Sequence, residues 1–420
     1  MKTDCKKNKI CRICFSERLK YIFSLNPTAP ANAYRIKIDD KFKLYPLEIS
    51  FCSNCKHVQL SHTVNPKILF SNYLYTSSAS EVYLKYLSNY SNSIIKKYNL
   101  NSNNDKICDI ASNDGSFLSF FEKKNFYVQG IEPAKNLCKV SSKKNIRTLN
   151  IFLNYNDIKK YKNLNNKFKI VTANHVFAHV EKLNDFFNSV DYLLSPDGIF
   201  IFEVGYLYSV IKNLHFDTIY HEHLDYHHFY PLNILCKKNN YKIIFSELTN
   251  TQGGSIRIHC VKKKNNLIKS NYSSISKIKK LEKNMKLNYF KTYVNFEKNI
   301  INNKSDFFRI AKKLNIFNKK IIGYGATAKV TTFLSYYNFP LNSIKYIIDD
   351  SNYKQNLFLP SHNIKIKKFS ILKKSNFDII IIFAWNFKDS IIKKLQKLDK
   401  NFKIIIPFPK TKIINVKNEN

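Results

Sequence analysis

The stretch KICDIASNDGSFLSFFEKKNFYVQGIE, residues 106–132, decides the fold. It begins with a short apolar strand at 106–110, continues through the turn Ser112-Asn-Asp-Gly115, and then has a helical apolar run from Phe117 to Lys124. A second strand at 127–132 ends on Glu132. Strands that alternate with helices in this way build parallel sheets, so the sequence predicts a doubly wound α/β domain.

The same alternation continues toward the C-terminus. Strands are expected at 168–174 and 198–203, with a helix at 181–194 between them. Alternating residues at 242–248 and 255–261 predict a hairpin, joined by the turn Thr251-Gln-Gly-Gly254. The hairpin would form an antiparallel edge on an otherwise parallel sheet. Residues 80–100 have the spacing of an amphipathic helix that leads into this domain.

A second α/β unit follows near the C-terminus. Lys320-Ile-Ile-Gly-Tyr-Gly-Ala-Thr-Ala-Lys329 has the order strand, glycine turn and helix, and later strands are expected at 344–350, 377–384 and 402–407. Between the units, 262–318 has helical spacing of Ile, Leu and Phe. We therefore expect an N-terminal lobe at 1–75, a doubly wound domain at 76–262, a helical connector at 263–318 and a smaller Rossmann-like α/β domain at 319–420.

Composition restricts the class of protein. The 420 residues are 44% hydrophobic, with 33 Phe and 27 Tyr, which permits sizeable cores and excludes wholesale disorder. No apolar run approaches the about 20 residues of a membrane span, and MKTDCKKNKICRIC has no apolar segment typical of export, so we expect a cytoplasmic protein. The net charge of +39 suggests a polyanionic partner, but Lys is spread over nearly every segment, which argues against a dedicated nucleic-acid surface.

Glycine is scarce, with only eight in the chain. Average usage of about 7% would give many more, so the remaining glycines are expected where the backbone needs a positive φ or a close approach. Several lie in the motifs that carry the candidate chemistry.

Two Cys-x-x-Cys pairs, Cys11/Cys14 and Cys52/Cys55, are separated by 37 residues. Two such knuckles on one ion form a tetrahedral zinc site, and four sulfur ligands leave no coordination position open for chemistry. A pair of disulfides is the alternative, and Cys5 or His57 could replace one ligand. Without an export signal, structural zinc is favoured.

Ligands of doubly wound sheets bind at the carboxyl ends of the strands, which groups 109–115, Glu132, 174–179 and 203–206 around one crevice. The first loop lacks the GxGxxG pattern, and Glu132 lies about 20 residues beyond it, where an acid can hold ribose hydroxyls. S-adenosylmethionine (SAM) is cationic, so acids favour it over NAD; a turn or cap role is the alternative. The predicted cofactor residues are Asp109, Asn113, Asp114, Gly115, Glu132 and Asn174.

Seven of the eleven histidines lie between 175 and 228, most densely in Asp217-Thr-Ile-Tyr-His-Glu-His-Leu-Asp-Tyr226. In an extended segment, His221 and His223 would share one side and Glu222 would face away. Metal binding and a plain core or surface role are alternatives. Acid–base catalysis is favoured because His exchanges protons near neutral pH, and Tyr or His can donate hydrogen bonds to an oxyanion.

In this order, the motifs resemble the three-domain SAM-dependent sugar C-methyltransferases that act on nucleotide-linked 4-keto-deoxysugars. The resemblance covers about residues 10–365 and rests on both Cys pairs, Tyr73-Leu-Tyr75-Thr-Ser-Ser, Ile110-Ala-Ser-Asn-Asp-Gly115, Gly130-Ile-Glu-Pro-Ala134, Ala173-Asn-His-Val-Phe-Ala-His-Val180, Tyr220-His-Glu-His223, Gln252-Gly-Gly-Ser255 and Gly323-Tyr-Gly-Ala-Thr-Ala-Lys329. It implies a zinc-binding lobe, a class I methyltransferase (Rossmann-like) domain and a C-terminal domain that closes over the sugar nucleotide.

The resemblance also implies roles for individual residues. His223 would remove the proton beside the ketone, and the reacting centre would be lined by Tyr220, Glu222, His179 and Tyr75. The sugar nucleotide would be bound by Tyr324, Lys329, Asp350, Lys354 and Gln355. The glycine turn and Lys329 could hold a phosphate, although a plain strand-to-helix turn is the alternative reading of this loop.

The expected function is therefore C-methylation of a nucleotide-linked keto-deoxysugar through an enolate. Methylation of oxygen or nitrogen on another acceptor is one alternative, and a basic zinc-knuckle protein that binds nucleic acid is another. We expect a monomer or homodimer without a membrane partner.

Overall fold

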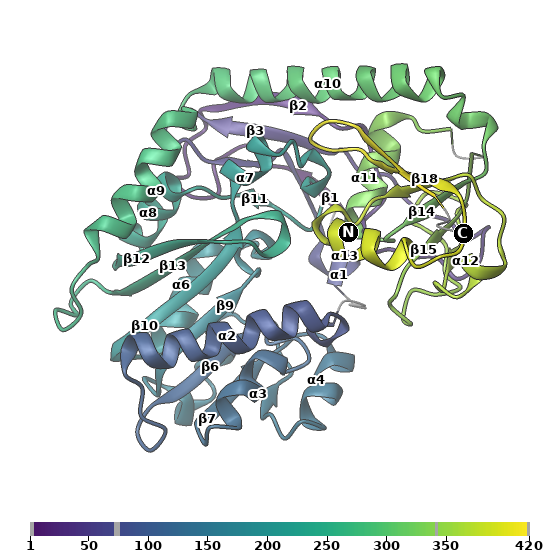
Figure 1. The fold of residues 1–420 in the computed structure, drawn as a ribbon. Helices are drawn as coiled ribbons and strands as arrows, with labels where there is room; N and C mark the ends of the chain where they lie inside the picture. The colour runs from purple at the N-terminus through teal and green to yellow at the C-terminus, as the bar shows by residue number, and fades with distance from the viewer. Residues whose placement is uncertain (1–3, 71–75, 341–342, 418–420) are drawn as a thin grey trace.

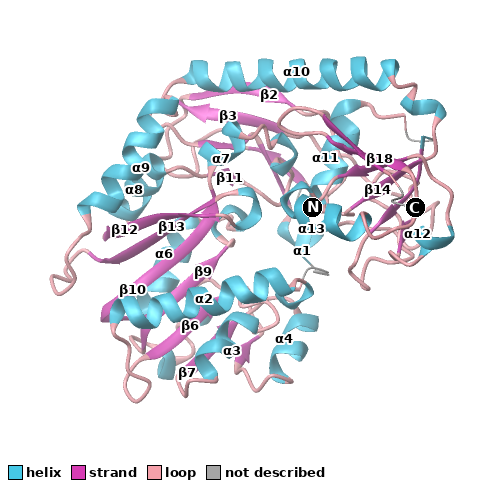
Figure 2. Ribbon diagram, in the orientation of Figure 1, coloured by secondary structure: helices cyan, strands magenta, loops and turns pink. Residues whose placement is uncertain are grey.

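A seven-stranded sheet forms the middle of the chain, in the order β12-β13-β10-β9-β6-β7-β8 (Figure 2). The structure is a computed structural model that describes residues 4–70, 76–340 and 343–417. Neighbours from β10 to β8 are parallel, whereas β13 is antiparallel to both β10 and β12. The predicted parallel sheet with an antiparallel edge is confirmed. Its strands are β6 (Lys106–Ile110), β7 (Tyr127–Ile131), β8 (Thr148–Leu149), β9 (Phe168–Asn174), β10 (Leu194–Gly205), β12 (Tyr241–Thr249) and β13 (Ser255–Lys262).

Helices cover both faces of this sheet, and its central strands are therefore largely buried. In β6, four consecutive residues after Lys106 are buried. The expected amphipathic helix is α2 (Glu81–Tyr98), where Ser80 caps the first turn by accepting a hydrogen bond from the backbone N–H of Tyr83. The other helices of this region are α3 (Ser116–Glu122), α4 (Lys135–Ser142), α5 (Tyr155–Ile158), α6 (Leu183–Leu193), α7 (Leu207–Lys212) and α8 (Phe229–Lys238).

The N-terminal lobe is antiparallel. One sheet has the order β11-β4-β3-β2, and a two-stranded ladder pairs β1 with β5. Strand β11 (Asp225–Tyr226) comes from the histidine-rich segment far along the chain and pairs with β4, which the sequence did not predict. The lobe's own elements are β1 (Cys5–Lys7), β2 (Leu19–Ser24), β3 (Glu48–Cys52), β4 (Val58–Leu60), β5 (His62–Val64) and α1 (Pro66–Phe70).

The connector consists of α9 (Tyr272–Met285) and α10 (Phe290–Lys313). Helix α10 runs along the top of the molecule in Figure 1, from α9 to the C-terminal sheet. Its buried residues recur every three or four positions, as an amphipathic helix requires. Phe296 and Tyr293 pack on the rings of Phe23 and Phe51, so the connector also fastens the N-terminal lobe.

The C-terminal region contains a six-stranded sheet in the order β16-β15-β14-β17-β18-β19, in which only the pair β18–β19 is antiparallel among the described strands. The predicted strands and the helix after the glycine turn are present. The elements are β14 (Ile321–Tyr324), α11 (Ala328–Tyr337), β15 (Ile344–Ile348), β16 (Ile366–Lys367), α12 (Ile371–Lys374), β17 (Ile379–Ile382), α13 (Lys388–Leu395), β18 (Phe402–Ile406) and β19 (Lys412–Val416).

We expected the few glycines to lie where the backbone needs a positive φ or a close approach, and the turn between β14 and α11 meets this expectation. Gly325 has a φ of +95°, and a Cβ there would lie 2.4 Å from the Cβ of Ala384. Gly205 does not follow the expectation, because a Cβ there would meet nothing within 4 Å.

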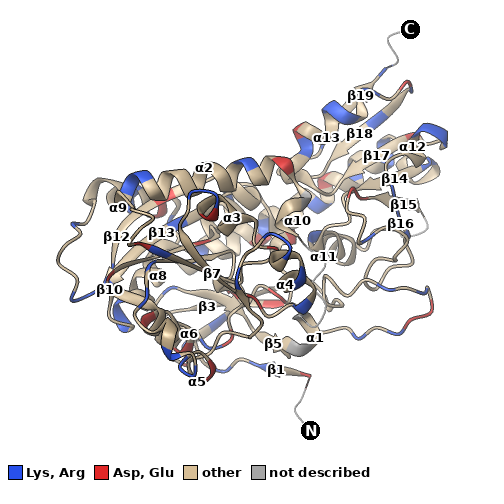
Figure 3. Ribbon diagram, turned by 90° about the horizontal axis from the view of Figure 1, so that it is seen from below, with Lys and Arg blue, Asp and Glu red and all other residues tan. Residues whose placement is uncertain are grey.

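Basic residues occur on elements of every part of the chain (Figure 3), as the even spread of Lys in the sequence predicts. Within the described ranges, no helix combines the length and apolarity needed to cross a bilayer.

Candidate active site and metal centre

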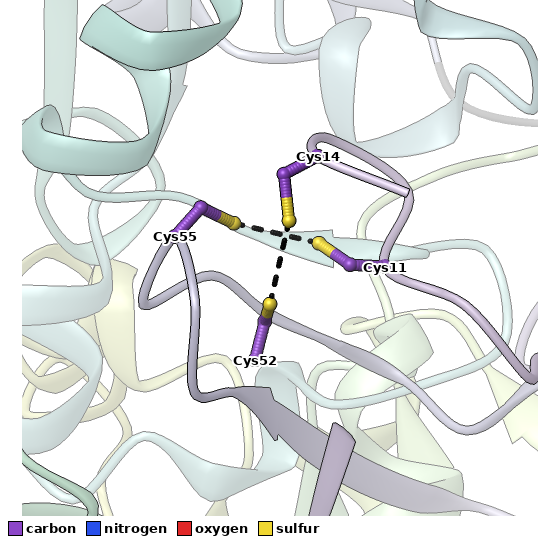
Figure 4. A group of neighbouring side chains, drawn as sticks. All are labelled: Cys11, Cys14, Cys52 and Cys55. Atoms are coloured by element: carbon purple, nitrogen blue, oxygen red, sulfur yellow. Dashed lines mark hydrogen bonds between the residues drawn. The ribbon is translucent and has the colours of Figure 1, made fainter. Parts of the chain in front are cut away.

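The four predicted cysteine ligands come together in the N-terminal lobe (Figure 4), with all sulfur atoms within 4.8 Å of one another. The Sγ atoms of Cys11 and Cys55 are 3.4 Å apart, and those of Cys14 and Cys52 are 3.5 Å apart. Zn–S bonds of about 2.3 Å in a tetrahedron separate sulfurs by about 3.8 Å, so these residues fit zinc. None of the four is in a disulfide. The protein binds a structural zinc ion here.

The two spare ligands considered from the sequence do not join this site. Cys5 lies on β1, opposite Val64. His57 Nε2 lies 2.8 Å from Asp225 Oδ1, which also accepts a hydrogen bond from Arg12 Nε. Among the described residues, the four cysteines form the one group of possible metal ligands at metal-binding spacing, and the structure does not bring the His-Glu-His triplet to such spacing.

A cavity of about 370 Å³ lies at the carboxyl ends of β6, β7 and β9. Four of the six predicted cofactor residues line it: Asp109, Asn113, Glu132 and Asn174. Asn174 Oδ1 is buried there without a protein partner, which leaves an acceptor for a cationic or hydroxyl group. Together with the two buried acids, this orphan acceptor fits SAM.

The two acids in the cavity are held by short contacts. Glu132 accepts the backbone N–H of Asn113 on Oε2 (2.9 Å) and that of Ala134 on Oε1 (2.8 Å). Asp109 accepts the hydroxyl of Thr172 on Oδ1 at 2.5 Å. Burial raises the pKa of Asp109 to about 7 and also raises the pKa of Glu132. A cation in the cavity would favour the ionised form of each acid.

Asp114 and Gly115 lie outside the cavity lining. Asp114 is fully buried and accepts the backbone N–H groups of Ser78 and Ser116, while Lys144 lies 3.3 Å away. Gly115 precedes α3 with a φ of +73°. Both residues shape the loop that carries Asn113, and the structure gives neither a direct contact with the cofactor cavity.

A second cavity of about 430 Å³ lies between the seven-stranded sheet and the six-stranded C-terminal sheet. It shares His175, His179 and Gln252 with the first cavity, so the two spaces meet at these side chains. Four predicted catalytic residues line it: His179, Tyr220, Glu222 and His223. The fifth, Tyr75, lies outside the described residues.

His223 is held in one tautomer. Its Nδ1 lies 2.8 Å from the carbonyl oxygen of Thr218, which can only accept, so Nδ1 carries the hydrogen. Nε2 then presents a lone pair, which accepts the Tyr220 hydroxyl at 2.9 Å. Burial and the neighbouring His179 lower the pKa of His223 well below 6.5. The imidazole is therefore a neutral base at physiological pH.

His179 and Glu222 complete this group. His179 Nδ1 donates to the carbonyl oxygen of Glu222 at 2.6 Å, and its ring centre lies 5.1 Å from that of His223. Burial lowers the pKa of His179 to about 4 and raises that of Glu222 to about 7. Asn32 donates to Glu222 Oε1, whereas the buried Oε2 has no protein partner. Glu222 can thus donate or accept a proton near neutral pH.

The expected extended conformation of this segment is wrong. Residues 220–222 form a turn in which the backbone N–H of His223 donates to the carbonyl oxygen of Tyr220. Consequently His221 is separated from His223 and lies against Tyr45, whose carbonyl oxygen is 3.2 Å from His221 Nε2. Glu222 would face away in an extended segment, but it lines the cavity, which is where the family resemblance puts it.

Four of the five predicted sugar-nucleotide residues also line the second cavity: Tyr324, Lys329, Asp350 and Lys354. Gln355 is not among them, and its side chain donates to the carbonyl oxygen of Asp349. Asp350 accepts the hydroxyl of Tyr324 at 3.0 Å and the ammonium group of Lys394 at 2.7 Å.

Lys329 has the most distinctive environment of these residues. Its ammonium group lies 3.8 Å from the centre of the Trp385 ring, and burial lowers the pKa of Lys329 to about 8. His215 stacks on Trp385 at 3.5 Å, and the indole N–H donates to Asp217. The sequence analysis did not identify Trp385, His215 or Asp217 as site residues. The one feature that could have drawn attention to them is that Trp385 is the only tryptophan in the chain.

Three family models match the chain in succession. They describe a putative zinc binding domain at residues 11–70, a methyltransferase domain at 83–245 and a C-methyltransferase C-terminal domain at 250–409. The chain is also similar to the C-methyltransferase NovU of Streptomyces niveus, with 24% identity over 419 residues that cover 97% of both chains.

Among solved structures, the chain is similar to the PH0226 protein of Pyrococcus horikoshii OT3 (17% identity, 45% of this chain, 95% of that chain, TM-score 0.37). It is also similar to the magnesium protoporphyrin IX methyltransferase of Synechocystis PCC 6803 (13% identity, 43% of this chain, 82% of that chain, TM-score 0.33). Scores this low carry no inference about function.

Proposed function

Because the chain belongs to the three-domain SAM-dependent C-methyltransferases, we propose that it methylates a carbon beside the ketone of a nucleotide-linked keto-deoxysugar. The observation that carries this proposal is the pair of neutral, tethered histidines in the cavity that meets the cofactor cavity. A base there can reach an acidic C–H bond next to the methyl donor.

The first step falls to His223. A ketone acidifies the neighbouring C–H bond, and the Nε2 lone pair takes that proton to form an enolate. Nε2 accepts the Tyr220 hydroxyl without substrate, so Tyr220 must release it when the sugar enters and can then donate to the developing oxyanion.

Glu222 and His179 would surround the same oxyanion. Glu222 has a pKa near 7 and an unpartnered Oε2, so its protonated form can donate a second hydrogen bond. His179 is fixed through Nδ1, so its ring keeps one orientation beside His223. SAM supplies the electrophilic methyl group when bound, and a molecule of SAM in the cavity at 109–132 would lie next to this centre.

The nucleotide end would bind on the C-terminal side of the cavity. The buried ammonium group of Lys329 lies over the face of the Trp385 ring. It has no ion-pair partner within 4 Å among the described residues. Asp217 attracts this ammonium group from beyond ion-pair distance, and a diphosphate would add negative charge in direct contact with it. Tyr34 and Lys354 close this side, where both donate to the carbonyl oxygen of Ala326.

Incubation of the enzyme with SAM and a panel of nucleotide-linked 4-keto-deoxysugars tests the proposal. Mass spectrometry should detect the gain of one methyl group on carbon in at least one sugar. Transfer to oxygen or nitrogen, located by NMR, would contradict the proposal in favour of an O- or N-methyltransferase.

A further inference from the structure

One arginine of the zinc knuckle reaches into the catalytic region. Arg12 lies between Cys11 and Cys14, and its side chain is only 8% exposed. The backbone N–H of Arg12 donates to Gln59 Oε1 at 2.8 Å, which ties this residue to β4. The guanidinium group therefore extends from a segment that two metal ligands hold on either side.

The guanidinium group joins the two segments that carry the catalytic histidines. Its Nε donates to Asp225 Oδ1 at 2.9 Å, and its Nη2 donates to the carbonyl oxygens of Val180 and Glu181, the latter at 3.1 Å. Val180 directly follows His179, and Asp225 is two residues after His223. One side chain thus links both segments at three points.

The acceptor Asp225 is itself firmly held. Its side chain is fully buried, and its Oδ1 also lies 2.8 Å from His57 Nε2. As part of β11, it is paired with Gln59 on β4 of the zinc-binding lobe. The backbone N–H of Leu224 donates to the carbonyl oxygen of Ala178 at 2.7 Å, so the two catalytic segments are also in direct contact.

We infer that Arg12 is a positioning residue: the zinc-held knuckle uses its guanidinium fork to fix the placement of His179 relative to His223. The effect of Arg12 on the reaction rate rests on the proposed function, whereas its effect on the placement of the two segments does not. Zinc binding would thereby set the geometry of the reaction centre, beyond holding the lobe folded. An arginine suits this position because its planar fork can bond several acceptors at once, which an ammonium group cannot.

The test compares Arg12→Ala and Arg12→Lys with the control Arg18→Ala. Arg18 is an exposed arginine of the same lobe, so the control removes the same charge. Zinc content, the SAM dissociation constant, hydrogen exchange by mass spectrometry, and kcat and KM for a keto-sugar nucleotide are measured for each. In Arg12→Ala, zinc content and SAM affinity should match the wild type, while hydrogen exchange rises at 176–182 and 218–227.

The same variant should lose about 10- to 100-fold in kcat with little change in KM, as small displacements of catalytic groups do. Arg12→Lys should recover part of that loss. Arg12→Ala with unchanged exchange and unchanged kcat would overturn the inference. Loss of zinc and SAM binding in both Arg12 variants would also overturn it, because Arg12 would then serve folding alone. If the wild type turns over no sugar in the panel, the proposed function fails, and hydrogen exchange alone decides the role of Arg12.

Discussion

Replacement of Glu132 by glutamine is the sharpest test of the cofactor cavity. Both carboxylate oxygens of Glu132 accept backbone N–H groups, at 2.9 Å and 2.8 Å. Glutamine replaces one oxygen with an NH₂ group, which cannot accept, so one buried N–H loses its partner. The number of lone pairs at residue 132 that remain free to accept the ribose hydroxyls of SAM is also halved.

The magnitude follows from the number of lost hydrogen bonds. A hydrogen bond to a charged group contributes about 1.5–3 kcal/mol, and each 1.4 kcal/mol is tenfold in affinity. One lost ribose contact should therefore raise the SAM dissociation constant by about 10- to 150-fold. Isothermal titration calorimetry measures this directly.

The control is Glu122→Gln, the same substitution at the end of α3, outside the cavity lining. It should leave the dissociation constant within about twofold of the wild-type value, because no cavity contact changes. If Glu132→Gln also bound SAM with wild-type affinity, the assignment of Glu132 to the ribose would be refuted.

Three other predictions concern the metal, the nucleotide and pH. Cys52→Ser should lower zinc content and reduce the melting temperature by about 5 °C or more, whereas Cys5→Ser should keep full zinc; a fully metallated, equally stable Cys52→Ser protein would exclude the Cys₄ site. Lys329→Met should raise KM for the sugar nucleotide by about tenfold or more at unchanged SAM affinity, and an unchanged KM would remove Lys329 from phosphate binding. Because burial lowers the pKa of His223, the neutral base persists below pH 6.5, so deuterium exchange at the sugar carbon should show no acid limb at that pH; a limb centred near 6.5 would contradict the buried base.

The architecture of the middle domain was largely predictable from the sequence. Its strands are short apolar runs that end in acids or turn residues, and local patterns of this kind determine both strand position and the edge that binds ligand. Asp109, Asn113, Glu132 and Asn174 follow from that rule and line one cavity. The cysteine spacing likewise predicted a metal centre that the folded chain assembles.

Long-range pairing was not predictable. Strand β11 joins a sheet whose other strands lie more than 150 residues earlier, and no local pattern encodes that partner. The turn at 220–222 lies just before this strand and is closed by a bond from the His223 N–H to the Tyr220 carbonyl oxygen, so the segment is not extended there. Asp114 illustrates a second limit. The sequence does not distinguish an acid that faces a ligand from one in the same loop that accepts backbone N–H groups, as Asp114 does.

The most direct measurement of the central claim is the exchange of the proton beside the ketone. A nucleotide-linked keto-sugar that the wild type methylates is incubated with enzyme in D₂O without SAM, and NMR follows the loss of that proton. The account predicts enzyme-dependent exchange in the wild type and none above background in His223→Ala, at equal SAM affinity. Exchange at the wild-type rate in His223→Ala would show that another group is the base.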